Sequence, residues 1–484
     1  MNTIKLEPKA VFECFSQINQ VPRPSKKEGK IIDFLVKFGE KHNLPTRVDE
    51  AGNVLITKPA TPGYEDRKTT VLQSHTDMVC EKNAGVEFDF ENDPIQTEVR
   101  GEWLHAKGTT LGADDGIGVA MAMAILQSNE IEHGPLECLF TSDEETGLTG
   151  AKELKAGFIS GDILINLDSE DEGQIFVSCA GGAGTEGIYD IEREALPDGH
   201  VAFVAKISGL LGGHSGDDID KNRANANKLL LRFLEAAGSN ADIRLFEIHG
   251  GNLHNAIPRE ANAVIAVERV GKEALEKAAE RFAGDVAEEL KSTEPNFKFE
   301  LLETSEQTEA YEKQAADKML KSLLVMHNGV YAMSTDMPGL VETSSNLASI
   351  HSNGREIKVL TSQRSAIMSA RRHISSVIRA AFALGGAKAT TADGYPGWKY
   401  NPDSEILKIS VDSYERLFDK SPQVRAIHAG LECGLFSEKY PQLDMISIGP
   451  TLRGVHSPDE RMHIPSVDLV WKHLLDILRN IPRK

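Results

Sequence analysis

Residues 69–77, Thr-Thr-Val-Leu-Gln-Ser-His-Thr-Asp, contain the pattern that decides the fold. The run 69–74 is short and largely apolar, which predicts a buried strand, and two metal-ligand types of side chain, His75 and Asp77, follow it directly. The pattern recurs twice: LECLFT (136–141) runs into Ser142-Asp143-Glu144-Glu145, and DILINL (162–167) runs into Asp168. A helical segment, 115–127, separates the first two runs, so the alternation predicts a largely parallel α/β sheet.

The segment upstream of this sheet is predicted to be helical. Ser25-Lys-Lys-Glu28 has the spacing of a capping box, and the stretch that follows, 31–42, has the apolar periodicity of an amphipathic helix. A helix before the first strand fits the same α/β arrangement.

The pattern of predicted strands and helices changes from about Gly182. Strands 201–207, 243–248 and 261–267 are separated by helix candidates 222–237 and 272–291, an order that resembles a ferredoxin-like β-α-β-β-α-β module. A further unit is expected within 313–384, with a strand at 357–361 and a helix at 369–384, although a duplication is only weakly indicated.

Alternating strand and helix patterns are predicted again after the turn-rich residues 393–404. A strand is predicted at 444–448, and apolar side chains from Val467 to Leu478 fall on one face of a terminal helix. We therefore expect a catalytic domain in two parts, 1–183 and 395–484, interrupted by a lid or dimerisation-type domain, 184–394, that could contain two subdomains.

Composition excludes several classes of protein. A chain of 484 residues favours two domains, and its 40% hydrophobic and 26% charged residues are ordinary for a globular protein. A net charge of −20 disfavours nucleic acid and anionic membranes as partners. The N-terminus lacks the basic start and apolar centre of a secretory signal, and the five cysteines show no CxxC spacing. We therefore expect a cytoplasmic protein with reduced cysteines and without a thiolate metal site.

Polar side chains at the ends of successive strands point to a metal site. Strand ends are where open α/β sheets build their sites, and one imidazole with several carboxylates suits Zn²⁺, Mn²⁺ or Co²⁺. Taken singly, a histidine at a strand end is more often structural, and acidic loops are usually solvated surface. The arrangement as a whole favours metal binding and is compatible with two ions.

These motifs together resemble the M20 di-zinc metallopeptidases. His75-x-Asp77, Gly112-Ala-Asp114-Asp115, Asp143-Glu144-Glu145, Asn166-Leu-Asp168 and the late His456 occur in the family's order and at comparable spacings. Longer stretches, among them SHTDMVCEK, TLGADDGIG and GPTLRGVHSPDE, are similar to the aminoacyl-histidine dipeptidase subgroup. The resemblance covers essentially the whole chain. It implies a zinc-peptidase-like catalytic domain, with a central mixed, largely parallel sheet flanked by helices, interrupted by an α+β ferredoxin-like lid.

The resemblance also implies a role for each ligand. Asp114 would bridge two divalent ions, His75 and Asp168 would complete the site of one, and Glu145 and His456 that of the other. A carboxylate can span two ions roughly 3.5–4 Å apart because it has two oxygens. The family pattern further implies a cis peptide between Asp114 and Asp115. The expected ions are Zn²⁺, with Co²⁺ or Mn²⁺ as alternatives.

Two acids beside these ligands would serve the reaction. Glu144 resembles the family's general base, which takes a proton from the attacking water and passes it to the leaving amine. Asp77 is the expected partner that orients the His75 imidazole through its other nitrogen. Without the surrounding motifs, Glu144 would be read as an ordinary surface acid.

Substrate-binding residues are expected in the insertion and in the second part of the catalytic domain. His214, in Leu-Gly-Gly-His-Ser-Gly, resembles the lid histidine that supports the oxyanion, and Asn255 belongs to a segment like the family's NxIP. Arg364 resembles the arginine that binds the substrate carboxylate, although Arg371 and Arg372 lie close by. Glu432 could meet a substrate's α-amino group or accept backbone hydrogen bonds in a loop.

The leading hypothesis is therefore hydrolysis of dipeptides, with a preference for Xaa-His substrates such as β-alanyl-histidine. Deacylation of N-acyl amino acids and tripeptide cleavage are the alternatives within the same fold. A non-catalytic metal-binding protein is disfavoured because every ligand and the base are present. The expected partner is a small peptide, with no nucleic acid or membrane, and a homodimer is left open.

Overall fold

The computed structural model describes residues 5–196, 198–239, 241–305 and 307–484. The chain forms two compact units: the first contains Met1–Ser178, Tyr400–Ala426 and Leu431–Lys484, and the second contains Cys179–Lys399 and Ile427–Gly430. The chain thus leaves the first unit and returns to it. The catalytic and lid roles predicted for the segments bounded at residues 183 and 394 stay predictions.

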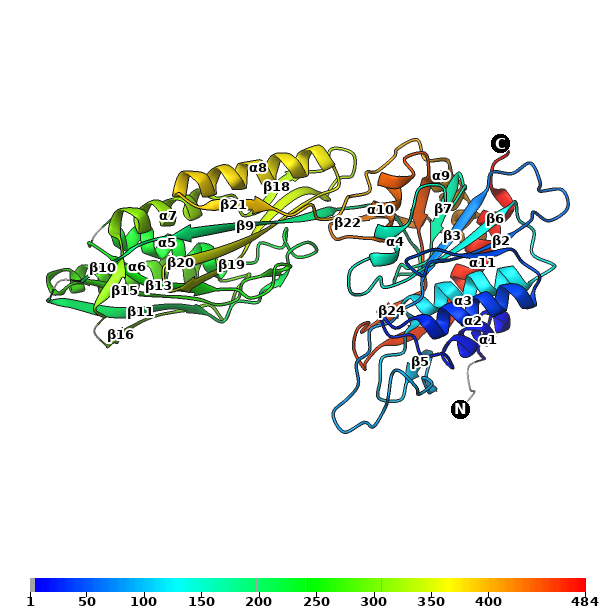
Figure 1. Ribbon diagram of the computed structural model, residues 1–484, viewed down its shortest axis with the longest axis horizontal. Helices are drawn as coiled ribbons and strands as arrows, with labels where there is room; N and C mark the ends of the chain where they lie inside the picture. The colour runs from blue at the N-terminus through cyan, green and yellow to red at the C-terminus, as the bar shows by residue number, and fades with distance from the viewer. Residues whose placement is uncertain (1–4, 197, 240, 306) are drawn as a thin grey trace. The chain divides into compact units, whose positions relative to one another are not determined.

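The first unit is built on an eight-stranded mixed sheet (Figure 1). Strand β3 pairs in parallel with β6 and β7, and β7 pairs in parallel with β23, whereas β1, β2 and β8 join antiparallel. This confirms the predicted mixed sheet with a parallel centre. In spatial order the strands are β1 (Thr46–Val48), β2 (Val54–Lys58), β6 (Leu136–Thr141), β3 (Thr70–His75), β7 (Ile163–Asn166), β23 (Asp444–Ser447), β8 (Gln174–Cys179) and β22 (Gln423–Ile427).

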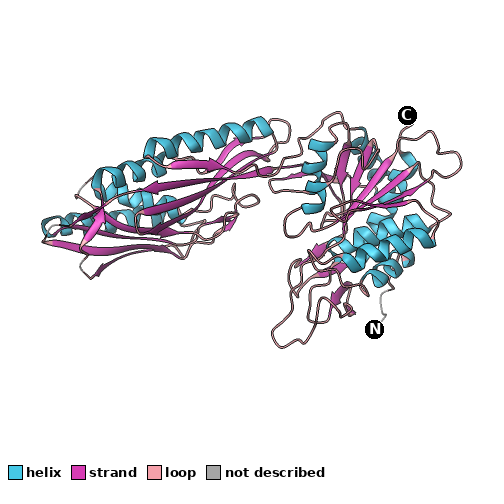
Figure 2. Cartoon of the chain, viewed as in Figure 1, coloured by secondary structure: helices cyan, strands magenta, loops and turns pink. Residues whose placement is uncertain are grey.

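Helices flank this sheet, and Figure 2 shows the first three grouped on one side of it. Helix α3 (Ala113–Gln127) packs on β3 and is buried around most of its circumference, which its sequence of alanines, glycines and large apolar residues permits. Helix α1 (Lys9–Ile18) packs on α3 and presents an apolar face to it. The remaining helices of the unit are α2 (Gly29–Lys41), α4 (Thr149–Glu153), α9 (Glu405–Phe418), α10 (Glu432–Lys439) and α11 (Ile464–Asn480).

A small antiparallel sheet carries the turn that contains His456. Its strands, in spatial order, are β24 (Leu452–Arg453), β25 (Arg461–His463), β5 (Trp103–Ala106) and β4 (Thr97–Arg100). Strands β24 and β25 pair as a hairpin, with Leu452 opposite Met462, so the intervening residues form its loop. The last predicted ligand therefore lies in the part of the first unit that the chain forms after it returns from the second unit.

The second unit contains a nine-stranded antiparallel sheet in which two modules of the same topology supply eight strands; the ninth, β18 (Gly329–Met333), pairs with β19 (Val341–Asn353). In the first module the order β-α-β-β-α-β comprises β11 (His200–Ser208), α5 (Ala226–Gly238), β13 (Arg244–Gly250), β15 (Ala261–Glu268), α6 (Lys272–Glu289) and β16 (Lys298–Thr304). Their spatial order, β16-β11-β15-β13, places the fourth strand beside the first and the third between the first and second. This is the ferredoxin-like arrangement predicted for these residues.

The second module is discontinuous in sequence. It consists of β9 (Gly181–Asp190), which precedes the first module, and of α7 (Lys313–Val325), β19 (Val341–Asn353), β20 (Glu356–Ser365), α8 (Met368–Gly385) and β21 (Lys388–Thr391). Their order, β19-β20-β9-β21, repeats the pattern of the first module. The two modules join where β13 pairs with β19, so the sheet is continuous. The weakly indicated duplication is therefore present.

Helices α5 to α8 cover one face of this sheet (Figure 1), and the main core lies between them and the strands. Phe203, Phe233, Phe282 and Phe382 are all at most 5% exposed within it. The shorter elements of the unit are β10 (Arg193–Ala195), β12 (Gly213–His214), β14 (Ala256–Ile257), β17 (Glu309–Tyr311), β18 (Gly329–Met333) and the 3-10 helix Arg269–Gly271. Among helices in the described part of the chain, none is both long and apolar enough to cross a bilayer.

The predicted capping box at the start of α2 is wrong. Glu28 occupies the N-cap position and makes no side-chain cap; its carboxylate accepts instead from the backbone N–H groups of Lys26 and Asp143. The Ser25 hydroxyl donates to Asp77 Oδ2 at 2.7 Å. Tertiary partners thus replaced the local pairing that the sequence spacing suggested.

Candidate active site

Three of the predicted ligands meet at the carboxyl ends of neighbouring strands. His75 is the last residue of β3, Asp168 follows β7, and Asp114 lies at the start of α3. The Nε2 atom of His75, which is 1% exposed, lies 2.9 Å from Asp114 Oδ1 and 3.4 Å from Asp168 Oδ1. Because β3 and β7 are adjacent and parallel, their ends place these side chains at one edge of the sheet.

The other two predicted ligands meet the second oxygen of Asp114. His456 Nε2 lies 3.2 Å from Asp114 Oδ2 and 3.0 Å from Glu145 Oε2. His456 adopts a positive φ of 61°, which turns the chain sharply inside the β24–β25 loop. Asp114 therefore faces one imidazole with each of its carboxylate oxygens.

The spacing of these donor atoms fits divalent metal ions. A tetrahedral zinc with bonds of about 2.0–2.1 Å holds neighbouring ligand atoms roughly 3.3 Å apart, close to the separations of 2.9–3.4 Å observed between the imidazole and carboxylate atoms. His75, Asp114 and Glu145 form one compact group of potential ligand atoms. In addition, Glu145 Oε1 is buried without a hydrogen-bond partner in the described structure. An ion would satisfy that oxygen.

The charges of the site call for cations. Burial and the neighbouring acids raise the pKa of Asp168, while the two imidazoles hold the pKa of Asp114 low despite its burial. Burial opposes the charging of His75, but the carboxylates of Asp168, Asp114 and Asp77 together raise its pKa well above the ordinary value. Burying several negative carboxylates together costs free energy unless positive charges lie beside them, and bound metal ions would supply those charges.

Asp77 contacts two elements of the site at once. Its Oδ1 lies 3.4 Å from His75 Nδ1, without the alignment of a good hydrogen bond. The same carboxylate accepts the backbone N–H groups of Glu144 at 3.0 Å and Glu145 at 3.2 Å. Although burial acts to raise it, these donors and His75 lower the pKa of Asp77 to about 2. The orienting role of Asp77 toward His75 stays a prediction; what the contacts show is that Asp77 binds the backbone of Glu144 and Glu145.

The loop that carries Glu144 and Glu145 turns sharply just before them. Asp143 has a positive φ of 48°, and its carboxylate accepts the hydroxyls of Thr146 and Thr149. Glu144 is half-buried, and burial together with the nearby Glu432, Glu145 and Asp114 raises its pKa to about 8. A carboxylate with a raised proton affinity suits a base, and bound cations would draw its pKa down.

A second group of buried acids, Glu28, Asp77 and Asp143, has the spacing of metal ligands but is already satisfied. Their oxygens accept the backbone and hydroxyl donors described above. This group therefore holds the loop that carries Glu144 in place.

The peptide between Asp114 and Asp115 is cis, as the resemblance implied. The Asp115 carboxylate accepts the backbone N–H groups of His75 at 3.2 Å and Gly118 at 3.2 Å, so this residue joins the end of β3 to the start of α3. Burial raises the pKa of Asp115 to about 8.

Glu432 lies deep in the first unit and is 1% exposed. Its Oε2 accepts the Gln73 amide at 2.6 Å and the Thr141 hydroxyl at 2.9 Å, whereas Oε1 has no partner in the described structure. The alternative of backbone hydrogen bonds in a loop is wrong, because the donors are side chains of β3 and β6. Burial raises the pKa of Glu432 to about 7. A contact with substrate stays a prediction.

The residues predicted in the insertion gather in the second unit. His214 is in β12, which pairs with β14, so the segment that contains Asn255 lies beside it. The carbonyl oxygen of Asn255 accepts the Ser215 N–H at 2.8 Å. Arg364, at the end of β20, has its Nη2 atom 3.4 Å from His214 Nε2 and donates through Nη1 to the Tyr395 hydroxyl at 2.9 Å. The structure thus brings together His214, Asn255 and Arg364.

The structure separates Arg364 from its two neighbours in sequence. Arg364 is 5% exposed, its Nε atom has no partner, and no carboxylate pairs with it in an ion pair among the described residues. Arg371 instead donates to the carbonyl oxygens of Gly182, Asp393 and Tyr395, and Arg372 is exposed. Arg364 is therefore the buried guanidinium that retains capacity for an anion.

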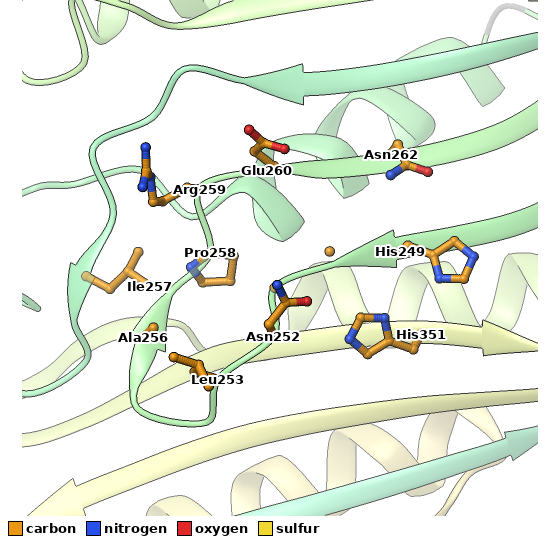
Figure 3. Close-up of a pocket in the computed structure, with 12 residues that line it drawn as sticks. His249, Asn252, Leu253, Ala256, Ile257, Pro258, Arg259, Glu260, Asn262 and His351 are labelled. Carbon is orange, nitrogen blue, oxygen red and sulfur yellow. The ribbon is translucent and has the colours of Figure 1, made fainter. Parts of the chain in front are cut away.

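A separate cavity of about 450 Å³ lies in the second unit (Figure 3). His249 and His351, paired across β13 and β19, lie on one side of it, and the loop with Ala256 and Pro258 lies on another. The cavity is lined by neither His214 nor Arg364. It is therefore distinct from the cluster that the sequence predicted.

Comparison with known proteins agrees with the geometry. The profile of Peptidase family M20/M25/M40 matches residues 71–480. The chain belongs to this family. It is 41% identical over 480 residues to the cytosol non-specific dipeptidase of Escherichia coli (strain K12), covering 99% of both chains. The aminoacylhistidine dipeptidase of Vibrio alginolyticus has a crystal structure that matches with a TM-score of 0.95 at 42% identity, over 99% of this chain and 98% of that one.

A solved structure of much lower identity shows a likeness of fold alone. The crystal structure of a tripeptidase from Staphylococcus aureus matches with a TM-score of 0.55 at 17% identity, over 98% of this chain and 99% of that one. Sequence reasoning did not identify Arg23 or Glu460, and it named Asp115 only as part of the motif and of the cis peptide, without its contacts. Their buried contacts join segments far apart in sequence, so local patterns gave no signal for them.

Proposed function

We propose that this M20 chain is a metal-dependent dipeptidase that uses two divalent ions, zinc in the first place and cobalt or manganese as alternatives. The observation that carries the proposal is that the two oxygens of Asp114 face two different imidazoles, those of His75 and His456. A bridging carboxylate of this kind is what a two-metal hydrolase requires. The two relatives of similar length are both named as dipeptidases, which supports the substrate class.

The first ion would be held by His75, Asp168 and Asp114, and the second by His456, Glu145 and Asp114. When bound, the ions would polarise the scissile carbonyl and make a water acidic enough to attack at neutral pH. Asp77 would keep His75 oriented and would hold the backbone of Glu144 and Glu145 in place.

Glu144 is proposed as the general base. It accepts the proton of the attacking water, and the same carboxylic acid then gives that proton to the departing amine nitrogen, so the proton balance closes within one residue. Its half-buried position and raised pKa favour both steps, and among the described residues no basic side chain forms an ion pair with it.

Arg364 and His214 are proposed to bind the substrate's carboxylate and the developing oxyanion, respectively. Arg364 is buried and retains an unpartnered Nε, so an incoming carboxylate would supply the missing acceptor. The His214 imidazole lies beside it, and Asn255 is in the adjoining segment. Recognition of a free C-terminal carboxylate would favour small peptides over internal peptide bonds.

The preference for Xaa-His substrates is proposed as well, with non-specific dipeptide hydrolysis as the competing outcome. The decisive experiment is a panel of Xaa-His dipeptides, other dipeptides, tripeptides and N-acetyl amino acids, assayed with metal-depleted and metal-reconstituted protein. Dipeptide hydrolysis that disappears on chelation and returns with Zn²⁺, Co²⁺ or Mn²⁺ is expected. Full activity of the metal-depleted protein, or a panel in which only N-acetyl amino acids react, would refute the proposal. The proposal includes a cytoplasmic location and leaves a homodimer open.

A further inference from the structure

We propose that Arg23 and Glu460 are positioning residues that hold Gly112 from its two sides and thereby set the spacing of the metal ligands. The inference rests on the metal centre proposed above. Neither residue is in the proposed ligand set, and both side chains are 2% exposed. Their contacts join three segments that are distant in sequence, and each of these segments carries a proposed ligand.

Arg23 joins the end of β3 to the loop before α3. Its Nη1 atom donates to the carbonyl oxygens of Thr76 at 3.1 Å and Asp77 at 2.9 Å, and Nη2 donates to the carbonyl oxygen of Gly112. Thr76 follows the ligand His75, and Gly112 precedes the ligand Asp114 by two residues. A planar guanidinium can bind such divergent carbonyls at once because its donors form a rigid fork.

The glycines of the LGADDG motif make room for this side chain. A Cβ atom at Gly112 would lie 2.5 Å from Arg23 Nη2, and one at Gly116 would lie 2.6 Å from the same atom. Gly112 also has a φ of 65°, where residues with a side chain are disfavoured. The motif therefore serves the close approach of the guanidinium as well as the turn.

Glu460 holds the same loop from its other side. Its two oxygens accept the backbone N–H groups of Leu111 at 2.7 Å, Gly112 at 3.0 Å, Ala113 at 2.8 Å and Asp114 at 3.4 Å. These groups form the start of α3, where N–H donors and the helix dipole favour a carboxylate. The loop of Asp114 is thus tied to the segment that contains Glu460.

That segment is the turn of His456. The Glu460 N–H donates to the Ser457 carbonyl oxygen at 3.0 Å, and the Ser457 hydroxyl donates to the Gly454 carbonyl oxygen at 2.7 Å. Glu460 therefore links the ligands Asp114 and His456 through a short, hydrogen-bonded turn. Arg23 correspondingly links His75 and Asp114. Each residue spans two of the three ligands proposed for one ion, and Asp114 is common to both.

Because each residue supports a different pair of ligands, each substitution should affect a different ion. Arg23→Lys replaces the fork with a single ammonium and should weaken binding of the ion held by His75 and Asp168. Glu460→Gln presents an amide N–H₂ to backbone donors and should weaken binding of the ion held by His456 and Glu145. Loss of a residue that supports metal ligands typically costs about 10–100-fold in metal affinity. We expect that increase in the dissociation constant of one ion, with a smaller change at the other.

The control is Glu137→Gln, because Glu137 is 6% exposed and its carboxylate likewise accepts backbone N–H groups, from Ser160 and Gly161, within the same unit. Metal dissociation constants would be measured by equilibrium dialysis, and cadmium NMR would report each site separately, with resonances assigned by Asp168→Asn and Glu145→Gln. The control should lower the Tm and leave both dissociation constants unchanged. Gly116→Ala, which keeps both charges but displaces Arg23, provides an independent test if a charge variant does not fold.

Three outcomes decide the inference. Selective loss of one cadmium resonance in each variant would support it. Wild-type affinities in Arg23→Lys, Glu460→Gln and Gly116→Ala would overturn it, as would equal weakening of both sites in step with the Tm and in Glu137→Gln alike. If the wild-type chain itself bound no metal, the proposed function would fail instead, so the two failures are distinguishable.

Discussion

The guanidinium of Arg364 donates a hydrogen bond to the phenolic oxygen of Tyr395 at 2.9 Å. This contact fixes the direction of a buried cation whose Nε has no acceptor in the part of the chain that the structure describes. A neutral hydroxyl orients the arginine without cancelling its charge, which leaves the charge available to an anionic substrate.

We predict that Arg364→Lys raises the KM for dipeptides by about 10–100-fold, because hydrogen bonds to charged groups contribute about 1.5–3 kcal/mol. Tyr395→Phe should raise the KM less. Arg372→Lys, at an exposed position nearby, is the matched control and should match wild type. Steady-state kinetics with a dipeptide and with its C-terminal amide would check this, since the amide should be nearly insensitive to Arg364→Lys. Equal effects on both substrates would contradict carboxylate binding.

Replacement of the proposed base should affect the rate and leave the metals in place. Glu144→Gln is expected to lower kcat by about 10²–10⁴-fold, the usual contribution of general acid–base catalysis. Metal content measured by atomic emission should equal that of wild type, and Glu153→Gln, an exposed acid on α4, should be fully active. Loss of a metal ion from Glu144→Gln would show instead that Glu144 is a ligand.

His214 tests whether the second unit contributes to the chemical step. If its imidazole donates to the oxyanion, His214→Ala should lower kcat by about 10²–10³-fold with little change in metal content. His249→Ala is the control, because His249 is a partly exposed histidine of the same unit that lines the separate cavity. Near-normal kcat in His214→Ala would reject the role, and a large effect in His249→Ala would point to the cavity.

A buried histidine of the first unit should make stability depend on pH. His473 is 3% exposed and its Nε2 lies 2.8 Å from the Ser410 carbonyl oxygen; burial lowers the pKa of His473 to about 4. The unfolded chain binds its proton near pH 6.5, so the contribution is fully present above that pH and is lost as the pH falls from about 6.5 to about 4. The difference is worth roughly 3 kcal/mol, at about 1.36 kcal/mol per unit.

Denaturant unfolding of wild type and His473→Gln across this range would measure the effect. The free-energy advantage of wild type should shrink as the solution becomes more acidic, whereas Lys472→Gln, at the exposed neighbouring position, should give a constant difference. A wild-type advantage that is independent of pH would show that His473 titrates normally in the folded state.

The sequence alone determined the strands and the ligands that follow them. The six residues 136–141 were predicted as a strand and form β6, in which all six are buried. A short, largely apolar run of this length is typical of a buried strand. Once β3, β6 and β7 were placed in a parallel sheet, His75, Glu145 and Asp168 had to reach the same edge. The order of the motifs then carried the resemblance to the M20 family.

Only the tertiary structure decided how distant segments complete the site. The His456–Asp114 contact joins residues 342 positions apart; the family resemblance implied that they meet at one ion, but no local periodicity encodes the contact. The same holds for Arg23 and Glu460, whose partners are backbone groups that any residue could supply, so their sequence carries no signal. The second ferredoxin-like module was likewise obscured, because β9 precedes the entire first module while its sheet neighbour β20 follows it. Local patterns are set by burial and periodicity along a segment; these contacts exist only after the chain has packed.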